Sequence, residues 1–255
     1  MLNDSWSLNS VAVDCRLAMN VGADDCERAT KDLAKRCLAK FDEANSSPDV
    51  RVFSLSIILS QISNGNSAML AYLPEMCRRL KDCSDLMLSV SGTETHDFHC
   101  QVINAASIIF KSSLTNLVDG CCDPLVHCLV QLVACHDIEV ASLACEFWAQ
   151  YCATPISTAS VRRRWMTVFE PQLPRLIEAL LDQMIFREHI ERCTLEGVCQ
   201  RAVAALKSIT RKYPANLICA TCVPLMQTRI ESDSWPVKEA AIRALPVFAL
   251  STGQL

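Results

Sequence analysis

Four residues in the first half of the chain have the side-chain types that bind zinc: Cys77, Cys83, His96 and His99. Zinc fingers place two to four residues between their cysteines and three to five between their histidines. Here five residues separate the cysteines and two separate the histidines. The helical pattern also assigns Cys77 and His99 to different helices. We therefore interpret these four as ordinary helix and loop residues, and we predict no metal and no other cofactor.

Two cysteine patterns could support redox chemistry. Cys219 and Cys222 form a CxxC motif, which in thioredoxin-like sites follows a strand and opens a helix. Here the motif lies inside a helical pattern just ahead of Pro224. Cys121 and Cys122 are adjacent at the start of an expected helix, and no partner motif accompanies them. We interpret the CxxC cysteines as packed thiols, and nothing in the sequence supports a disulfide in the adjacent pair.

The usual signatures of catalysis are missing from the sequence. It contains no Walker loop, no GxSxG elbow, no GxGxxG motif and no HExxH motif. With 6 glycines in 255 residues, the chain has little material for a phosphate-binding loop. A nucleophilic Cys/His pair would not need to be adjacent in sequence, but no residue is singled out for that role. We predict that the chain is not an enzyme.

An arginine run, Arg162 to Arg164, precedes Trp165 at the start of an expected helix. One interpretation is a site for an acidic or phosphate-bearing partner. The other is a solvated face beside an inward-packed Trp165. Glu188, Glu191 and Glu196 follow further along, and we interpret them as part of a solvated link between helices.

A pattern of apolar and small residues recurs five times and predicts the elements that position these side chains. The pattern starts at Val50, Phe98, Val140, Val198 and Val237. Four residues on come Ser54, Val102, Ala144, Ala202 and Ala241. Eight residues on come Ile58, Ala106, Trp148, Leu206 and Leu245. Steps of four keep these positions on one face of an α-helix, and successive starts lie 39 to 58 residues apart. That spacing brackets the period of HEAT repeats.

The pattern predicts an all-α chain, an α-solenoid of about five HEAT repeats made of antiparallel helix pairs. The expected pairs cover residues 26–63, 67–112, 114–152, 160–213 and 215–251, after an irregular or partial helix at 1–25. The first helices of the later pairs contain Pro74, Pro124, Pro174 and Pro224, which we expect to bend them. Short side chains at the fourth position let stacked helices approach closely, and the residues at the eighth position fill the space between pairs.

Composition narrows the class of protein. Apolar residues make up 51% of the chain, which disfavours disorder, and the net charge of −4 gives no basic surface for nucleic acid. No basic cluster precedes an apolar segment at the N-terminus, and no apolar run is long enough to span a bilayer. We expect a soluble intracellular protein with neither a membrane nor a nucleic-acid partner.

Sixteen cysteines are present, and most of them lie on apolar helix faces. Without a secretion signal they are expected to be reduced thiols that pack as small apolar side chains. The cysteines predicted to lie on apolar helix faces include Cys77, Cys128, Cys135, Cys145 and Cys152.

Three stretches of the chain resemble the transportins, the karyopherin-β family of nuclear import receptors. Ala144-Cys145-Glu146-Phe147-Trp148 resembles the seventh HEAT repeat of that family. Ser46-Ser47-Pro48-Asp49-Val50-Arg51 resembles the turn that opens an earlier inner helix, and Trp235-Pro236-Val237-Lys238-Glu239 resembles the inner helix of the ninth repeat. Their order and intervals match across residues 40–255, so the chain resembles a middle segment of such a receptor.

The resemblance implies nuclear import of cargo that carries a proline-tyrosine nuclear localisation signal. It also implies nucleoporins and the Ran GTPase as partners, and location in both cytoplasm and nucleus. The family's cargo groove begins on the helices that here start at Val198 and Val237. By match, the cargo-binding positions are Ala204, Lys207 and Leu245, and Lys207 stands where the family has an acidic contact.

The match also implies that Ran-driven release is weakened or lost. The link at 186–195 is short and mixed in charge, where the family has a long acidic loop. The N-terminal repeats that make most of the Ran contact have no counterpart in the matched segment. The alternative to a transport receptor is a generic HEAT scaffold for protein–protein interaction, similar to a phosphatase regulatory subunit.

Overall fold

The computed structural model describes most of the chain in separate stretches. The described residues are 23–42, 54, 57–58, 69, 71–88, 93–112, 123–154, 166–185 and 192–252. The chain divides into two compact units, Met1–Met76 and Cys77–Leu255. Predictions for residues 1–22, Cys121, Cys122, Arg162 to Trp165, and the link at 186–191 fall outside the described residues.

Helices account for all the regular structure in the described stretches. They are α2 (Ala23–Asp42), α5 (Leu73–Leu88), α6 (Thr93–Ser112), α7 (Asp123–Val133), α8 (Ile138–Ala153), η1 (Glu170–Gln172), α10 (Leu173–Gln183), α11 (Arg192–Lys212), α12 (Ala215–Glu231) and α13 (Trp235–Thr252). Residues 166–169 are also helical and lead into η1. This composition confirms the predicted all-α class.

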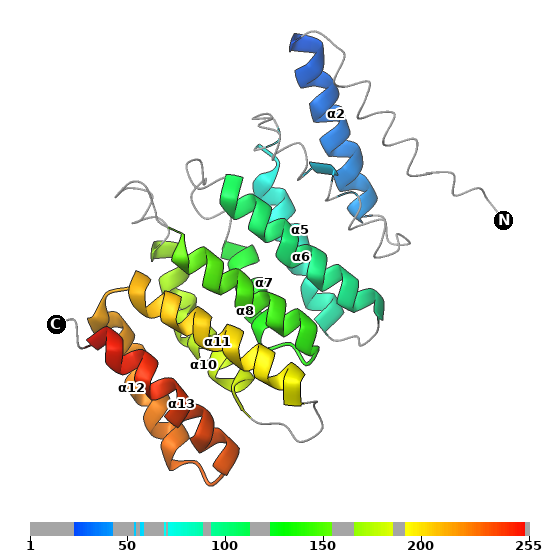
Figure 1. Cartoon of the computed structure of the whole chain (residues 1–255). Helices are drawn as coiled ribbons and strands as arrows, with labels where there is room; N and C mark the ends of the chain where they lie inside the picture. The colour runs from blue at the N-terminus through cyan, green and yellow to red at the C-terminus, as the bar shows by residue number, and fades with distance from the viewer. Residues whose placement is uncertain are drawn as a thin grey trace. The chain divides into compact units, whose positions relative to one another are not determined.

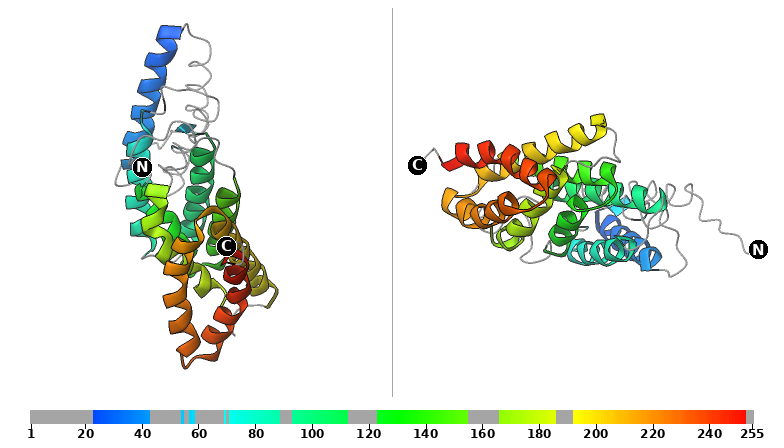
Figure 2. Two further views of the ribbon diagram at one scale, coloured as in Figure 1. Left: turned by 90° about the vertical axis from the view of Figure 1, so that its left-hand side faces the viewer. Right: turned by 90° about the horizontal axis from the view of Figure 1, so that it is seen from below.

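Within the unit Cys77–Leu255, the helices form two layers (Figures 1 and 2). The second helix of each pair lies in one layer, in the order α6, α8, α11, α13, which we call the second-helix layer. The helices α7, α10 and α12 form the other, the first-helix layer. Within pairs, α7 packs on α8, α10 on α11 and α12 on α13. Between successive pairs, α6 packs on α8, α8 on α11, α11 on α13, α7 on α10 and α10 on α12. Stacked antiparallel helix pairs are the architecture of an α-solenoid.

In the first unit, α2 is the longest described element. Leu33, Ala34, Cys37 and Leu38 are buried, and the intervening charged residues are exposed. Steps of three and four place these apolar residues on one face of the helix. The amphipathic helix predicted from Cys26 onward is therefore present.

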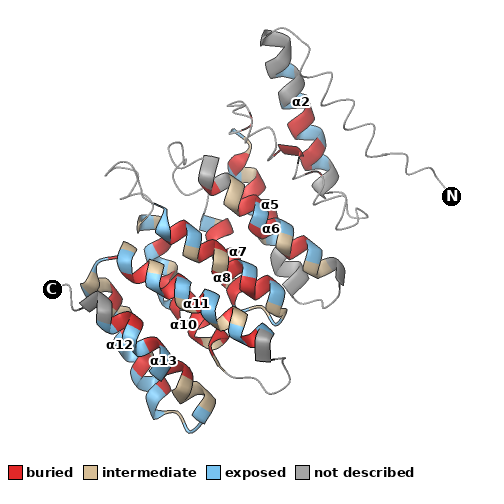
Figure 3. Cartoon of the chain, viewed as in Figure 1, coloured by how far each residue is buried: buried red, intermediate tan, exposed pale blue. Residues whose placement is uncertain are grey.

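The repeat pattern correctly predicts which residues are buried between helix pairs. At the fourth position, Val102, Ala144, Ala202 and Ala241 are all at most 1% exposed. At the eighth position, Trp148 and Leu206 are likewise buried. Figure 3 shows the buried residues as stripes along the packed faces of these helices. The small residues therefore lie where neighbouring helices approach each other, as predicted.

Leu245 departs from the pattern. It is 42% exposed, whereas the equivalent residues Trp148 and Leu206 are covered. In the stretches that the structure describes, α8 and α11 are each followed by another helix of their layer, and α13 is not. The prediction that the eighth position is always buried is wrong at this residue, because no described helix packs on that side of α13.

The prediction that prolines bend the first helices is wrong for two of them. Pro74 and Pro124 are each the second residue of their helix, in α5 and α7. Proline in the first turn removes no intrahelical hydrogen bond, because those N–H groups have no carbonyl to bond. Pro174 instead lies inside the helical run 166–183, where the 3-10 segment η1 interrupts the α-helix just ahead of it, and Pro224 lies inside α12. Pro246 is a further interior proline, in α13.

Polar side chains tie α10 to α7 and α11 to α8, in successive helix pairs. The Gln183 side chain at the end of α10 donates to the Val133 carbonyl at the end of α7, at 2.7 Å. Lys212 Nζ at the end of α11 donates to the Tyr151 carbonyl in the last turn of α8, at 2.9 Å. C-terminal carbonyls lack α-helical hydrogen-bond donors, and the contact from Gln183 satisfies such a group at Val133. The Tyr151 carbonyl also accepts from the backbone N–H of Thr154, so Lys212 adds a second donor to it.

Arg229 makes the corresponding tie between α12 and α10. Its Nη2 lies 2.6 Å from the Asp182 carboxylate and 3.3 Å from the Glu178 carbonyl, and the side chain is 10% exposed. A buried guanidinium needs a partner such as the Asp182 carboxylate, because burying an unpaired charge costs on the order of several kcal/mol. The three ties fix how far one pair is displaced along the next.

Candidate functional site

Three residues of the zinc-like pattern have described side chains, and they lie in different surroundings. Cys77 on α5 is fully buried, and His99 on α6 is 3% exposed beside Phe98. His96 instead lies against the start of α8. Across the described stretches, no group of three or more His, Cys, Asp or Glu side chains is placed to hold a metal ion. The Cys83 side chain lies outside the described residues.

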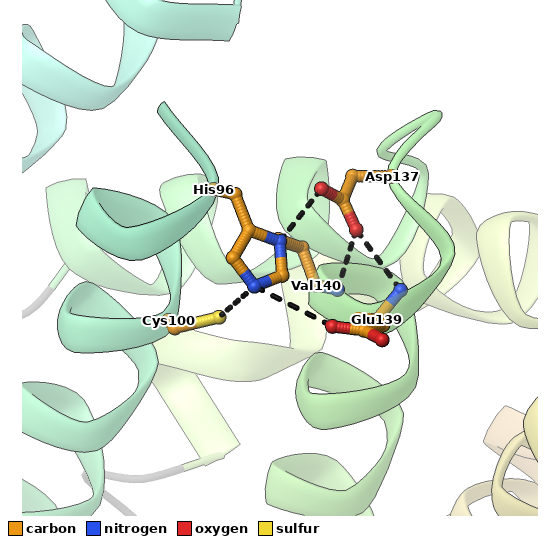
Figure 4. Close-up of polar contacts among 5 residues, drawn as sticks. All are labelled: His96, Cys100, Asp137, Glu139 and Val140. Atoms are coloured by element: carbon orange, nitrogen blue, oxygen red, sulfur yellow. Dashed lines mark hydrogen bonds and ion pairs between the residues drawn. The ribbon is translucent and has the colours of Figure 1, made fainter. Parts of the chain in front are cut away.

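His96 forms the centre of a polar cluster between α6 and α8 (Figure 4). Its Nδ1 lies 2.7 Å from Asp137 Oδ2, and its Nε2 lies 3.5 Å from Glu139 Oε2 and 3.7 Å from Cys100 Sγ. Asp137 is the N-cap of α8, where Oδ1 accepts from the backbone amides of Glu139 and Val140. One carboxylate therefore caps a helix and holds a histidine from the preceding pair.

The electrostatics of this cluster favour a charged imidazole. The hydrogen bond to Asp137 raises the pKa of His96, burial opposes it, and the charges of Asp137, Glu139 and Asp97 add to the increase. Burial alone would raise the pKa of Asp137. The hydrogen bonds from His96 and from the backbone amides of Val140 and Glu139 nevertheless leave that pKa below its ordinary value. The two groups form an ion pair across the junction.

The contacts from Cys100 to His96 and from His96 to Asp137 are also the ones that activate a cysteine nucleophile in an enzyme. Here burial raises the pKa of Cys100, and the nearby charges of Asp137, Asp97 and Glu139 raise it further. A nucleophilic cysteine needs the opposite shift, because the thiolate is the reactive form. What the geometry shows is that the contact between His96 and Asp137 joins α6 to the start of α8.

The ion pair predicts a specific pH dependence of stability. The folded-state pKa of His96 lies above 6.5, so its contribution is complete below that pH and is lost as the pH rises through the raised value. The folded-state pKa of Asp137 lies below 3.8, so its contribution is lost as the pH falls below that value. Between pH 6 and pH 8, we expect the free energy of unfolding of wild type to fall by about 0.5–1 kcal/mol more than that of Asp137→Asn, as measured by urea unfolding.

Asp137→Asn is the informative variant because its side-chain oxygen can still cap α8. Asp137→Ala removes the cap as well, and should be about 1 kcal/mol less stable than Asp137→Asn at either pH. Equal pH dependence in wild type and Asp137→Asn would show that the pair between His96 and Asp137 does not contribute.

The CxxC cysteines occupy the middle of α12. Cys222 is buried, Cys219 is half-buried, and both are free thiols. Burial raises the pKa of Cys222 to about 12, and the neighbouring Cys219 adds to the increase. A redox-active CxxC needs a lowered pKa in one cysteine. The position and electrostatics agree with the interpretation as packed thiols.

Most of the other singled-out cysteines pack as predicted. Cys77, Cys128, Cys145 and Cys152 are buried, and burial raises the pKa of Cys145 and of Cys152 to about 12. Cys135 is different: it is half-buried in the turn after α7 and not on an apolar helix face. The helix ends at Val133, before this residue.

The three predicted cargo-binding residues lie in the second-helix layer and are all exposed. Ala204 and Lys207 are on α11, and Leu245 is on α13. Positions three and four apart share a helix face, so Gln200, Ala204 and Lys207 form one exposed stripe of α11. The helices α11 and α13 pack side by side, and both bear exposed residues (Figure 3). The structure therefore places the predicted residues on adjacent helices at the surface.

Charged residues on this layer are partly paired. Arg201 of α11 lies 3.4 Å from Glu146 of α8 and also donates to Ser142. Arg243 of α13 lies 2.6 Å from Glu239 on its own helix. Lys207 and Arg211 form no ion pair with any other described residue. The surface of α11 therefore keeps positive charge in its C-terminal half.

Sequence reasoning missed the residues that join neighbouring pairs, namely His96, Arg201 and Arg229. Their partners lie 41 to 59 residues away in the sequence, so no local spacing indicates them. One local signal was present: Asp137 directly precedes the apolar run of α8, as an N-cap does.

Comparisons with known proteins assign no family. No protein-family model matches the chain, and no curated protein matches it. Among solved structures, the chain is similar to an engineered protein solved by the Northeast Structural Genomics Consortium. The two are 16% identical, the match covers 96% of this chain and 98% of that chain, and the TM-score is 0.43. A similarity at this level carries no functional information.

None of the described helices combines enough length with enough hydropathy to cross a bilayer.

Proposed function

We propose that this chain is a segment of a nuclear transport receptor that binds cargo on the exposed face of α11 and α13. The observation that supports it is the placement of Ala204, Lys207 and Leu245 at the surface of two adjacent helices. These are the positions that the resemblance to transportins assigns to cargo. Stacked helix pairs present such continuous surfaces, on which extended partner segments bind.

The cargo would carry a proline-tyrosine nuclear localisation signal and pass the pore through contacts with nucleoporins. Shuttling between cytoplasm and nucleus follows from that role. Binding of the Ran GTPase would be weak in this chain, because the link at 186–195 is short in the sequence. These details rest on the resemblance of Ala144-Cys145-Glu146-Phe147-Trp148 and its companion stretches.

A generic protein-binding scaffold is the second candidate. Lys207 favours it, because this exposed lysine replaces an acidic contact expected for a basic signal. In that case the same face of α11 and α13 would bind a different partner, and neither Ran nor the proline-tyrosine signal would be recognised.

Replacing each of two exposed alanines with tryptophan tests the proposed face. Ala204 is an exposed residue in the middle of α11, and Ala220 is an exposed residue in the middle of α12, in the other layer. We expect Ala204→Trp to weaken binding of a labelled proline-tyrosine signal peptide by about tenfold or more, because the indole occupies the contact surface. Ala220→Trp should bind as wild type does.

The measurement is fluorescence anisotropy of the peptide, with a parallel titration of Ran bound to GTP. Equal weakening by both substitutions would contradict the assignment of the face. If wild type binds neither the peptide nor Ran, the transport role is excluded.

A further inference from the structure

Exposed apolar side chains gather on the helix pair α12 and α13. In the part of the chain that the structure describes, six large apolar side chains are exposed, and five of them lie on this pair. They are Val223, Ile230, Trp235, Ile242 and Leu245. The described exposed side chains of α11, by contrast, are polar apart from Ala204. A concentration of exposed apolar side chains marks an interaction surface.

On α13 the exposed residues follow the spacing of a helix-packing surface. Five residues that succeed one another in steps of three and four form what we call the α13 seam. They are Trp235, Lys238, Ile242, Leu245 and Ala249. Ile242, in the middle, is 50% exposed, whereas Ala240, Ala244 and Val247 on the opposite side of the helix are buried. Alternating steps of three and four place residues along the line on which two helices pack in a coiled coil.

The helix stack indicates what kind of element fits the α13 seam. Leu245 is equivalent to Trp148 and Leu206, which are buried. Those two residues lie on α8 and α11, and each of these helices packs on the next helix of the second-helix layer. Stacked repeats cover equivalent faces in the same way. An apolar α-helix is therefore the element that continues this packing on α13.

Charge on the α13 seam makes it complementary to itself in one orientation. Lys238 is the charged member of the seam and lies in the first half of α13. Two parallel copies of the helix would bring their Lys238 side chains together. Two antiparallel copies place each Lys238 beside the C-terminal half of the other helix, where the helix dipole favours a cation. The other four members of the seam are apolar and can pack on their counterparts.

We propose that the α13 seam binds the α13 seam of a second copy of this chain, with the two helices antiparallel. Ile242 and Leu245 lie in the middle of the contact and pack against the same residues of the second copy. An isologous contact of this kind uses one surface twice and closes at the dimer. The contact needs no cargo, so it goes beyond the proposed function. Where both hold, the second copy covers Leu245 and competes with cargo for it.

Sedimentation equilibrium of the full chain provides the test. We expect wild type to dimerise with a Kd of about 10–100 µM, because one helix contact buries a small interface. The variants Ile242→Glu/Leu245→Glu and Ile242→Lys/Leu245→Lys should each dimerise at least about tenfold more weakly, because like charges meet across the contact. Mixed together, the two variants should pair with each other, because glutamates then face lysines. Val223→Glu/Ile230→Glu replaces two exposed apolar residues of α12 and is the matched control, which should dimerise as wild type does.

Lys238→Ala tests the orientation. It should weaken the antiparallel dimer by about twofold or more, because a cation beside the end of the other helix is lost. A stronger dimer in this variant would overturn the antiparallel arrangement in favour of a parallel one. Wild type that stays monomeric up to about 0.2 mM would overturn the inference in favour of a different occupant of the α13 seam. Dimerisation that survives in both charged seam variants, or that only the α12 variant abolishes, would overturn it in favour of another face. A circular dichroism melt of each variant shows whether folding is retained, since Ile242 and Leu245 are exposed.

Discussion

Replacing Ala144 with glutamate is expected to destabilise the protein by on the order of 4 kcal/mol or more. Ala144 is fully buried in α8, which packs against α6, α7 and α11. A carboxylate at this position would be buried without a partner, and its larger side chain would push apart helices that a methyl group holds close. A thermal melt followed by circular dichroism should show a decrease in Tm of about 10 °C or more.

The same substitution at an exposed alanine is the matched control. Ala204→Glu places the carboxylate at the surface of α11, near Arg201 and Lys207 on the same helix. Its Tm should stay within about 2 °C of wild type, because exposed substitutions away from special features change stability little. If Ala144→Glu melts as wild type does, the packing assigned to the fourth position of the repeat pattern is wrong.

Trp148→Ala is the second substitution with a large expected effect. Trp148 is 1% exposed, and its ring lies 5.4 Å from that of Phe169 in a T-shaped arrangement and 5.4 Å from that of Phe147. Tyr151 stacks on Phe169 in the same cluster, at 4.8 Å. Removing the indole leaves a cavity between helix pairs, which is expected to cost about 3–5 kcal/mol in urea unfolding.

Trp235 offers a control with the same side chain. It begins α13 and is 64% exposed. Trp235→Ala should change the free energy of unfolding by less than about 1 kcal/mol, because little apolar surface is buried there. Similar losses in both variants would mean that the aromatic cluster around Trp148 does not hold the pairs together.

The repeat pattern was a reliable guide to the fold because burial follows helical periodicity. Residues four apart share a face, and stacking covers the same face in each pair, so Val102, Ala144 and Ala202 are all buried. The pattern does not say which face is covered at α13, on which no further described helix of its layer packs. That is why Leu245 was expected inside and lies exposed.

The prolines show a second limit of periodicity. The sequence pattern does not separate an interior proline from a first-turn proline. The difference depends on where the helix begins, which is the least certain feature of a helical pattern. With α7 beginning at Asp123, Pro124 lies in the first turn of its helix.

The contacts that tie one pair to the next were beyond the reach of the sequence. Gln183 bonds to Val133, which is 50 residues away, and Lys212 bonds to Tyr151, which is 61 residues away. Each contact depends on how far one pair is displaced along its neighbour, and the repeat spacing leaves that displacement open. Ala204 and Lys207 were singled out by the family resemblance alone, and the structure places both at the surface of α11, off its buried face.

The most direct test of the account is to locate a bound peptide on the molecule. A proline-tyrosine signal peptide with a photo-crosslinking residue would be irradiated with the full chain, and the crosslinked sites read by mass spectrometry. We predict crosslinks on α11, around Ala204 and Lys207, and on α13. Crosslinks confined to α10 and α12, or none at saturating peptide concentration, would contradict a cargo-binding face on the second-helix layer.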